Sequence, residues 1–525
     1  MATTPSFGKA YVLGSFKSLW RRVGDRWLSS VRASVISTSR DAHPWKHPYL
    51  STKNIQSFRS YSEEIWSFAL SYATTARTKL RSAFSVNMAQ NMYKWARLAR
   101  RYGADATLFL HAMDNTALNT PQWEEFDGEY SDIFDGNGFL AQSAEVIPEV
   151  PWERIPLDST ELANAYSAYQ GGHAKPLLRL MSGCNGMRHE VFSSHPSFFA
   201  YYDWAKALSR FDVIYAASAP FAAYASGRPY CLFSVGGDLQ FDCGRGDWFG
   251  QAMTLAFNGG RFLMISNPHT LGHSRRLGLT NGVYLPYPMD TERYCPGFGS
   301  ARAQWDSEYG PGIYVLTTAR LDSGVKGHGD EFFRMLASVA QERPNLRFIF
   351  LAWGHSADEF KTRIQREGLQ KQLIVLAPVG KKRLINYYRS CDVVLDQFVY
   401  GYYGATALEA ASIGKPVVMK IHADQYSSLY ADDVAPVMNV STPAEIRQAI
   451  LSLADSADLR TRMGEAMRNW VVRNHGEAKT TPLLLALLRL AADRVPLPTH
   501  LVNPLCDPES EDEIAYHQSC LQPAP

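Results

Sequence analysis

Hydrophobic and polar positions alternate in two long blocks along this chain. Between residues 82 and 290, short apolar runs alternate with amphipathic segments such as 90–102, whose apolar positions recur at helical spacing. The runs predict buried strands at 82–87, 105–111, 212–216, 229–235, 261–266 and 282–286. Only the stretch 114–180, rich in Pro, Gly, aromatic and acidic residues, interrupts the pattern and predicts an insertion or a loop system on the acceptor side of a cleft.

A second alternation follows a Pro-, Gly- and Ser-rich boundary near 288–305. It predicts strands at 313–318, 346–352, 373–378, 393–398 and 416–419, with helices between them. Strands that alternate with helices are typical of parallel, doubly wound sheets. The chain is therefore predicted to be an α/β protein with two Rossmann-like domains that face each other across a cleft.

The two ends of the chain depart from this pattern. The first sixty residues hold ten Lys or Arg against two acids, and segment 16–28 spaces Leu, Val and Trp as in a helix, with Arg between them. That pattern predicts either a helix on a membrane surface, a transit peptide, or an extension that packs on the main body. After residue 494 there are five acids and neither Lys nor Arg, so an unstructured tail is predicted.

These patterns give a division of the chain into five parts. They are a basic extension (1–81), an N-terminal domain (82–290), a C-terminal domain (291–475), a final helix (476–494) and an acidic, Pro-rich tail (495–525).

The length, net charge and cysteine content of the chain exclude some classes of protein. A length of 525 residues calls for more than one core, and a net charge of +2 gives no reason to expect a nucleic acid partner. Since no apolar run approaches 18 residues, no membrane-spanning helix is expected. Seven cysteines without C-x-x-C spacing argue against a metal site or a disulfide framework and favour a reducing, cytoplasmic location, with membrane contact possible only through residues 1–81.

The segment 392–419 carries the strongest functional signal. It predicts a buried strand, a Gly-bearing turn (400–404), a helix (405–412) and a second buried strand. A helix that begins after such a turn presents free N–H groups and the positive end of its dipole, which favours phosphate. Glu409, one turn further on, is placed to accept hydrogen bonds from a sugar hydroxyl. The pattern predicts a nucleotide site at the carboxyl ends of a parallel sheet.

Two cations follow the first strand of the same domain. Arg320 and Lys326 lie in the loop after residue 318, at the sheet edge where open α/β sheets bind ligands. A guanidinium fork and a lysine ammonium suit a diphosphate, and they could stabilise charge on a departing diphosphate without a metal.

The loop 320–327 followed by 404–418 resembles the C-terminal domain of retaining family-4 glycosyltransferases of the GT-B fold, the glycosyl transferases group 1. The resemblance implies that Arg320 and Lys326 bind the donor diphosphate and that Glu409 holds the ribose. It also implies that main-chain groups at Gly404, Ala405 and Thr406 receive phosphate. Residues 377–380, represented by Val379, correspond to the segment whose backbone contacts the base.

Two positions depart from the family pattern. The first Glu of its E-x7-E motif falls at Gly401, and the loop 87–93 has none of the glycines that members commonly carry there. Asp396, on the preceding strand, is either the replacement for the missing carboxylate or a buried residue that caps the loop. Asp238, in a Gly-Gly-Asp turn, either faces the cleft and orients a sugar or caps its own turn.

The predicted function is transfer of a sugar, with retention, from a nucleotide-diphosphate sugar to a hydroxyl acceptor. The predicted enzyme is of the hexosyltransferase type and uses neither metal nor cofactor, with Arg320, Lys326 and Asp238 as catalytic candidates. The alternative is a catalytically degenerate relative that serves as a binding or assembly subunit.

Overall fold

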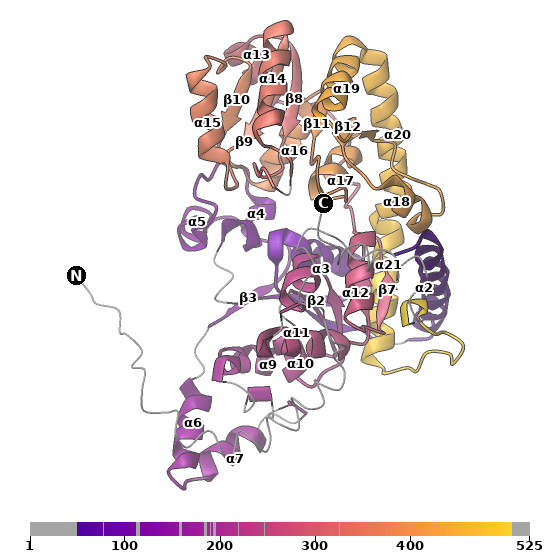
Figure 1. Cartoon of the computed structure of the whole chain (residues 1–525). Helices are drawn as coiled ribbons and strands as arrows, with labels where there is room; N and C mark the ends of the chain where they lie inside the picture. The colour runs from indigo at the N-terminus through magenta and orange to yellow at the C-terminus, as the bar shows by residue number, and fades with distance from the viewer. Residues whose placement is uncertain are drawn as a thin grey trace, which may run out of the picture.

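The structure is a computed structural model that describes residues 50–506 apart from 77, 112–115, 157–159, 183–185, 189–190, 193–195, 219, 246 and 325. The predicted amphipathic segment 16–28 and the acidic tail beyond 506 lie outside the described residues. The chain forms two α/β domains stacked end to end, with α17 at their junction (Figure 1).

The N-terminal domain is built on a parallel sheet of seven strands in the order β3-β2-β1-β4-β5-β6-β7. Its strands are β1 (Arg81–Ser85), β2 (Asp105–His111), β3 (Trp152–Ile155), β4 (Val213–Ala217), β5 (Tyr230–Phe233), β6 (Leu263–Ile265) and β7 (Gly282–Tyr284). Six of them coincide with predicted strands. The exception is β3, which lies in the stretch predicted as an insertion of loops and pairs with β2 at the sheet edge.

The helices of this domain cover both faces of the sheet, as in a doubly wound fold. They are α2 (Thr52–Ala73), α3 (Asn91–Arg101), α4 (Gln122–Glu125), α5 (Gly136–Gln142), α6 (Thr160–Gln170), α7 (Lys175–Ser182), α9 (Tyr202–Leu208), α10 (Phe221–Ala225), α11 (Trp248–Asn258) and α12 (Pro268–Arg276). Helices α6 and α7 project from the end of the domain remote from the other domain, whereas α4 and α5 lie against that other domain (Figure 1).

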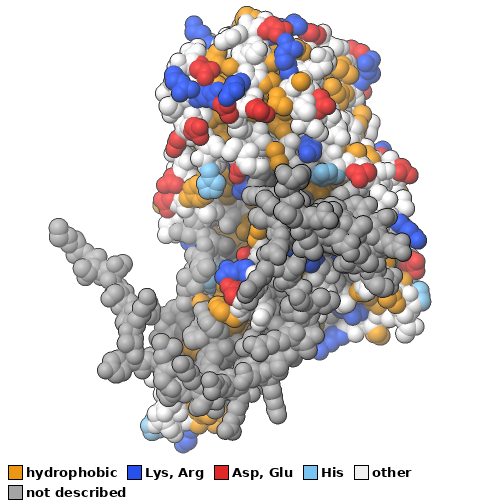
Figure 2. Space-filling view, viewed as in Figure 1, with side chains coloured by type: hydrophobic (Ala, Val, Ile, Leu, Met, Phe, Trp, Pro, Cys, Tyr) orange, Lys and Arg blue, Asp and Glu red, His pale blue; other side chains and the backbone are white. Residues whose placement is uncertain are grey.

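The C-terminal domain has a parallel sheet of six strands in the order β10-β9-β8-β11-β12-β13. Its strands are β8 (Ile313–Thr317), β9 (Leu346–Leu351), β10 (Leu373–Leu376), β11 (Val393–Leu395), β12 (Val417–Met419) and β13 (Met438–Asn439). The helices are α13 (Ala301–Tyr309), α14 (Asp330–Glu342), α15 (Ala357–Arg366), α16 (Lys381–Ser390), α17 (Ala405–Ser412), α18 (Ala423–Leu429), α19 (Pro443–Asp455), α20 (Ala457–His475) and α21 (Glu477–Ala492). Figure 2 shows Lys and Arg interspersed with Asp and Glu over the exposed face of this domain.

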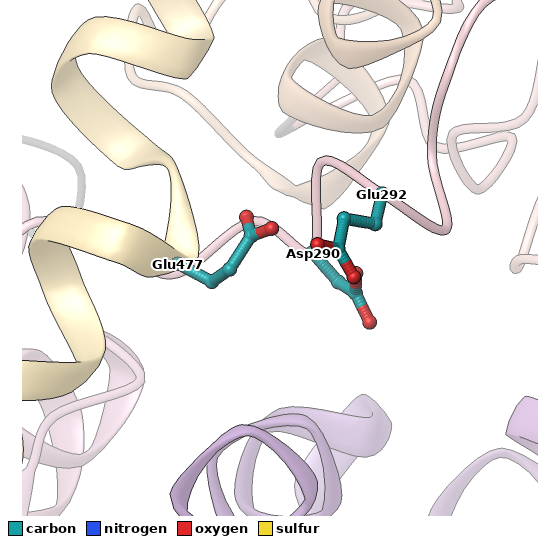
Figure 3. Close-up of side chains that lie close together, drawn as sticks. All are labelled: Asp290, Glu292 and Glu477. Carbon is teal, nitrogen blue, oxygen red and sulfur yellow. The ribbon is translucent and has the colours of Figure 1, made fainter. Parts of the chain in front are cut away.

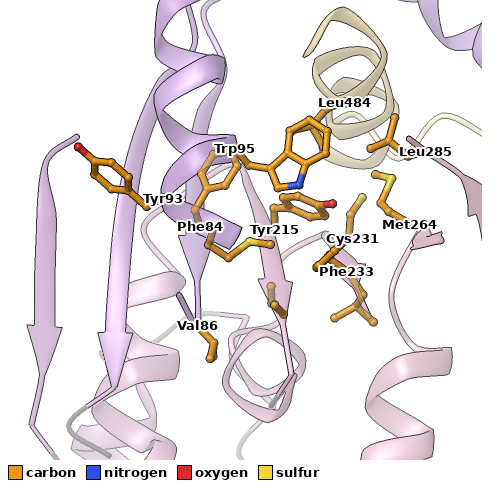
Figure 4. Packing of buried hydrophobic residues seen from close by; sticks show 14 of the residues in the cluster. Phe84, Val86, Tyr93, Trp95, Tyr215, Cys231, Phe233, Met264, Leu285 and Leu484 are labelled. Atoms are coloured by element: carbon orange, nitrogen blue, oxygen red, sulfur yellow. The ribbon is translucent and has the colours of Figure 1, made fainter. Parts of the chain in front are cut away.

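The last helix returns to the N-terminal domain. Helix α21 packs on α3, β4 and β5, and its Leu484 lies beside Trp95 and Leu285 in the N-terminal core (Figure 4). Helix α2 packs along α21, and its Trp66 donates a hydrogen bond from the indole N–H to the Tyr284 carbonyl at 2.8 Å. Residues 52–73 of the basic extension therefore form a helix on the main body, whereas the three alternatives for segment 16–28 fall outside the described residues. Among the described residues, no helix has the length and apolarity needed to cross a membrane.

Candidate active site between the two domains

A cavity of about 770 Å³ lies between the domains, at the carboxyl ends of β8, β9, β10 and β11. All nine residues predicted as site residues line it: Asp238, Arg320, Lys326, Val379, Asp396, Gly404, Ala405, Thr406 and Glu409. The convergence follows from topology, because parallel strands that are neighbours in a sheet deliver the residues after them to one edge. The individual roles of these residues stay predictions.

Helix α17 begins at the cavity. Its N-cap residue Gly404 has no side chain that could accept a hydrogen bond from the first N–H groups of the helix. Asp396 accepts a hydrogen bond from the third of these groups, the Ala407 N–H, and so caps part of the helix start. Among the described residues, the other carboxylate oxygen, Oδ2, has no hydrogen-bond partner, and Asp396 is 1% exposed. Burial raises the pKa of this carboxyl, and the nearby charge of Lys326 offsets part of that rise. Asp396 therefore has one oxygen bound to the helix and one still able to bind a ligand.

The loop after β8 holds the two predicted phosphate-binding cations. Arg320 is 42% exposed at its side chain and its Nε lies 3.5 Å from Asp322. A buried imidazole supports the loop, since His328 lies 2.9 Å from the Asp396 carbonyl and 3.3 Å from the Arg320 carbonyl. Burial lowers the pKa of His328 to about 4, so the ring is neutral near pH 7. A neutral imidazole has a single N–H, so His328 donates a hydrogen bond to one of these two carbonyls, contacts the other, and adds no charge to the loop.

Glu409 is bound by two lysines from different domains. Lys94 of α3 donates to Oε1 at 2.8 Å, and Lys381 of α16 donates to both oxygens at 2.7 and 2.9 Å. Tyr388 adds a longer contact at 3.4 Å to Oε2. Burial alone would raise the pKa of Glu409, but the charges of Lys381 and Lys94 outweigh it and lower the pKa to about 2. Glu409, the residue predicted to bind the ribose, is therefore an ionised carboxylate whose oxygens already accept hydrogen bonds from protein side chains.

The loop after β1 has the backbone of a glycine loop without its glycines. Val86, Ala89 and Gln90 have φ values of 62°, 49° and 67°, and Ala89 and Gln90 line the cavity. Left-handed backbone at residues with a Cβ is costly and is held only where surrounding contacts over-determine it. Here Asn119 accepts a hydrogen bond from the Ala89 N–H at 2.9 Å, and Gln90 donates to the carbonyls of Leu118 and Thr120 at 2.6 Å.

Gly401 occupies the position of the first motif carboxylate. Its φ is 80°, and a Cβ placed there would lie 2.5 Å from the His422 ring. Gln397 accepts a hydrogen bond from the Gly401 N–H at 2.9 Å, which fixes the turn. The preceding residue, Tyr400, lines the cavity instead. The loop is therefore built around glycine, and no side chain from this position can enter the site without rearranging His422.

Asp238 lies on the N-terminal wall and is 3% exposed. Its carboxylate accepts hydrogen bonds from the Ser234 hydroxyl at 2.6 Å and from the N–H groups of Leu239 and Val235 at 2.9 and 3.2 Å. Burial raises its pKa to about 6, although these hydrogen bonds lower it in part. Asp238 therefore both lines the cavity and caps its own turn, while its predicted role in orienting a sugar stays a prediction.

Three carboxylates, Asp290, Glu292 and Glu477, lie together where the interdomain linker meets α21 (Figure 3). Arg97 and Arg101 of α3 both approach Asp290 at 2.9 Å, and Arg101 also reaches Glu292 at 3.3 Å. Burial alone would raise the pKa of Asp290, but the Arg101 hydrogen bond and the Arg97 charge lower it. The positive charges of these two arginines offset part of the negative charge of the cluster. The ion pairs connect the segment between the two domains to α3, which indicates a structural role for the cluster.

Residues 307–470 match the family model of the glycosyl transferases group 1. This segment holds eight of the nine predicted site residues, on the strand ends and helix start just described. The C-terminal domain is a glycosyl transferases group 1 domain. The Arg320–Lys326 loop and the start of α17 therefore lie at the edge of the group 1 domain that lines the interdomain cavity.

Two curated relatives each align with less than half of this chain. A mannosylfructose-phosphate synthase from Agrobacterium fabrum is 26% identical over 154 residues, which cover 28% of this chain and 34% of the relative. A D-inositol 3-phosphate glycosyltransferase from Pseudarthrobacter chlorophenolicus is 25% identical over 213 residues, 40% of this chain and 50% of the relative. The chain thus spans about a third to a half of the length of these relatives.

Solved structures share the two-domain GT-B fold with most of this chain. The Anabaena protein HepE in complex with UDP superimposes with a TM-score of 0.51 at 14% identity, over 78% of this chain and 100% of that one. Sucrose-phosphate synthase from Thermosynechococcus elongatus gives a TM-score of 0.52 at 14% identity, over 79% and 100%. At this identity the likeness establishes the fold alone. It confirms the predicted α/β architecture of two Rossmann-like domains.

Sequence reasoning missed several residues of the cavity wall. Lys381 directly follows the predicted segment 377–380, and Tyr400 lies inside the predicted Gly-bearing turn. Lys94, which binds Glu409 behind the cavity wall, left no signal, because an amphipathic helix carries lysines routinely and nothing in the sequence indicates its partner. The wall residues Leu118, Trp123 and Ile133 fall in the stretch 114–180, which was predicted as an insertion or a loop system without wall residues being assigned.

Proposed function

We propose that this chain is a retaining glycosyltransferase that moves a sugar from a nucleotide-diphosphate sugar to a hydroxyl acceptor. The observation that carries the proposal is the convergence of all nine predicted site residues, which come from both domains, on one interdomain cavity. The group 1 domain supports it, because that family's name describes this class of transfer.

In the proposed reaction, the bond between the anomeric carbon and the diphosphate oxygen breaks as the acceptor oxygen bonds to the same face of that carbon. The acceptor proton passes to the departing phosphate oxygen. Arg320, Lys326 and the first two N–H groups of α17 stabilise the charge that develops on the diphosphate. The interdomain cavity positions the reactants and limits the access of water to them. These cations take the place of a metal, so release of nucleoside diphosphate should persist in the presence of a chelator.

The test is release of nucleoside diphosphate across a panel of nucleotide sugars, for the unmodified chain and Lys326→Ala. The expected result is release with one donor and a loss of about a hundredfold or more in the variant. Exposed Lys382, whose side chain is 54% exposed on the neighbouring helix, provides the matched control Lys382→Ala. Equal release by Lys326→Ala and the unmodified chain would refute the role of this lysine.

A binding or assembly subunit is the second candidate, and one observation favours it. Gly401 removes the motif carboxylate, and Glu409 is occupied by two lysines. Such a subunit would bind a nucleotide sugar without turnover in the presence of any acceptor. Release of nucleoside diphosphate by the unmodified chain, abolished by Lys326→Ala, excludes this candidate.

A further inference from the structure

Residues 117–143, here called the strap, leave the N-terminal domain and dock on the C-terminal one. An antiparallel bridge joins Glu129 to Val379. The Tyr130 N–H donates to the Pro378 carbonyl at 2.9 Å, and the Gly380 N–H donates to the Gly128 carbonyl at 3.0 Å. In Figure 1, the strap helices α4 and α5 lie directly beneath the C-terminal domain. The strap thus pairs with the segment predicted to contact a nucleotide base.

The approach of the strap is unusually close. A Cβ at Gly380 would lie 2.3 Å from the Phe126 carbonyl oxygen and 2.6 Å from the Phe126 Cβ. Only glycine permits this spacing, although its φ of −62° is open to any residue. Arg383 adds contacts at 3.4 Å to Asp127 and Glu129. The docking is therefore specified by sequence on both sides.

The strap carries its own small core, and that core meets the cavity. Ala117, Trp123, Ile133 and Phe139 form a buried cluster against which Trp353, at the end of β9, packs. From this cluster Trp123 and Ile133, with neighbouring Leu118, line the same cavity as Trp353, Val379 and Leu384 of the C-terminal domain. This apolar part of the lining, here called the slot, therefore takes residues from both domains.

Val379 supplies the polar groups of this slot. The two strap hydrogen bonds flank the Glu129–Val379 pair, so the N–H and C=O of Val379 point away from the strap. Within the described part of the chain, neither group has a hydrogen-bond partner. A donor and an acceptor side by side between apolar walls match the hydrogen-bonding edge of a nucleobase, whose faces are apolar.

We propose that Leu118, Trp123 and Ile133 of the strap form the outer wall of a nucleobase subsite, so that both domains determine donor specificity. This inference rests on the proposed function. It goes further in assigning base recognition to the N-terminal domain as well as to the C-terminal segment 377–380. The strap also holds the strained loop 87–90 through Leu118, Asn119 and Thr120, which places the base wall and that loop on one element.

The test measures binding of UDP, GDP, ADP and inorganic pyrophosphate by calorimetry, using the full chain. Leu118→Ala and Ile133→Ala should each weaken the preferred nucleoside diphosphate about tenfold while pyrophosphate affinity changes less than about twofold, since pyrophosphate has no base. Leu118 is only partly buried, so this variant keeps the test valid if Ile133→Ala fails to fold. The matched control is Phe134→Ala, which removes the 68% exposed neighbour of Ile133 from outside the cavity and should change nothing.

The outcomes separate the two proposals. If the unmodified chain binds no nucleoside diphosphate, the proposed function fails and the base subsite fails with it. If it binds one and both wall variants bind equally well, the wall assignment alone is overturned. An equal loss of nucleotide and pyrophosphate affinity would also overturn it, because that loss reports a damaged cavity instead of a missing base contact.

Discussion

The ammonium of Lys94 lies 2.8 Å from the carboxylate of Glu409, across the boundary between the two domains. Both side chains are almost fully buried, at 6% and 1% exposed. Lys381 occupies the same carboxylate, so two ammonium groups share one negative charge. A ribose hydroxyl can bind Glu409 only by displacing one of these donors. Lys94 is the more easily displaced, because it makes one bond to the carboxylate where Lys381 makes two.

Replacing Lys94 should therefore shift the balance between nucleoside and phosphate recognition. Lys94→Met keeps the apolar stem and vacates one lone pair on Glu409, which favours the ribose. It also removes a positive charge near the cavity, which disfavours phosphate. The ratio of nucleoside diphosphate affinity to pyrophosphate affinity should rise about three- to tenfold. Calorimetric titration of both ligands measures it.

The control for this experiment lies on the same helix. Arg100 is 37% exposed and pairs with Asp105 at 3.8 Å, so Arg100→Met removes a cation of α3 that does not line the cavity. The affinity ratio should not change in this variant. A lower ratio of nucleoside diphosphate affinity to pyrophosphate affinity in Lys94→Met would mean that Lys94 promotes nucleoside binding and does not compete with the ribose for Glu409.

Replacing Gly401 by a residue with a side chain, including the motif's glutamate, should destabilise the protein. Gly401→Ala places a Cβ 2.5 Å from the His422 ring in a backbone with φ of 80°, and should lower the free energy of unfolding by on the order of 1–3 kcal/mol. Gly401→Glu should cost at least as much and should not increase transfer. Denaturant unfolding measures the stability, and nucleoside diphosphate release measures the transfer.

Two further variants separate the causes of that loss. Gly404→Ala should be nearly neutral for stability, because no atom lies within 4 Å of a Cβ there and φ is −114°. Combining Gly401→Ala with His422→Ala should recover the part of the loss due to the ring contact and leave the part due to positive φ. If Gly401→Ala is as stable as the unmodified chain, the turn does not require glycine.

Much of this site could be predicted from sequence because its determinants are local. An apolar run followed by a Gly turn predicted a helix at 405–412, and α17 has these bounds. The residues that follow neighbouring parallel strands lie at one edge of the sheet, where ligands bind in such folds. The Lys94–Glu409 pair could not be predicted, since 315 residues separate its members. The strap could not be predicted either, because residues 128–130 and 378–380 pair through main-chain groups and nothing in the sequence indicates that Gly380 and Arg383 face this strap. Positive φ at Val86 and Ala89 is likewise invisible where glycine is absent.

The strained loop after β1 predicts that the same substitution, Ala to Gly, has effects of different size at two sites. Ala89→Gly relieves a φ of 49°, so the folded state gains about what the freer unfolded chain costs, and stability should change by less than about 1 kcal/mol. Ala96→Gly, in the buried interior of α3, should destabilise the protein by about 1 kcal/mol or more. Both are measured by denaturant unfolding. A loss in Ala89→Gly as large as in Ala96→Gly would show that the left-handed backbone carries no strain.

The two buried histidines should make stability depend on pH in a known direction. Burial lowers the pKa of His328 and of His475 to about 4, from about 6.5 in an unfolded chain. Between these values the unfolded state binds protons that the folded state excludes, so the free energy of unfolding falls as the pH drops from about 6.5 to 4. Each histidine contributes on the order of 2–3 kcal/mol to that fall. Above pH 7 neither contributes any slope.

The His328→Asn variant isolates one of these contributions. It should be less stable than the unmodified chain at pH 7, because the ring contacts to the Arg320 and Asp396 carbonyls are lost. Its stability should nevertheless fall less steeply between pH 6.5 and 4. Asp238, whose pKa is raised to about 6, acts in the opposite direction between about pH 4 and 6, so the slopes of variant and unmodified chain are compared instead of either slope alone. Equal slopes would mean that His328 becomes protonated in the folded state, and the buried bridge between the cationic loop and Asp396 would then carry a charge.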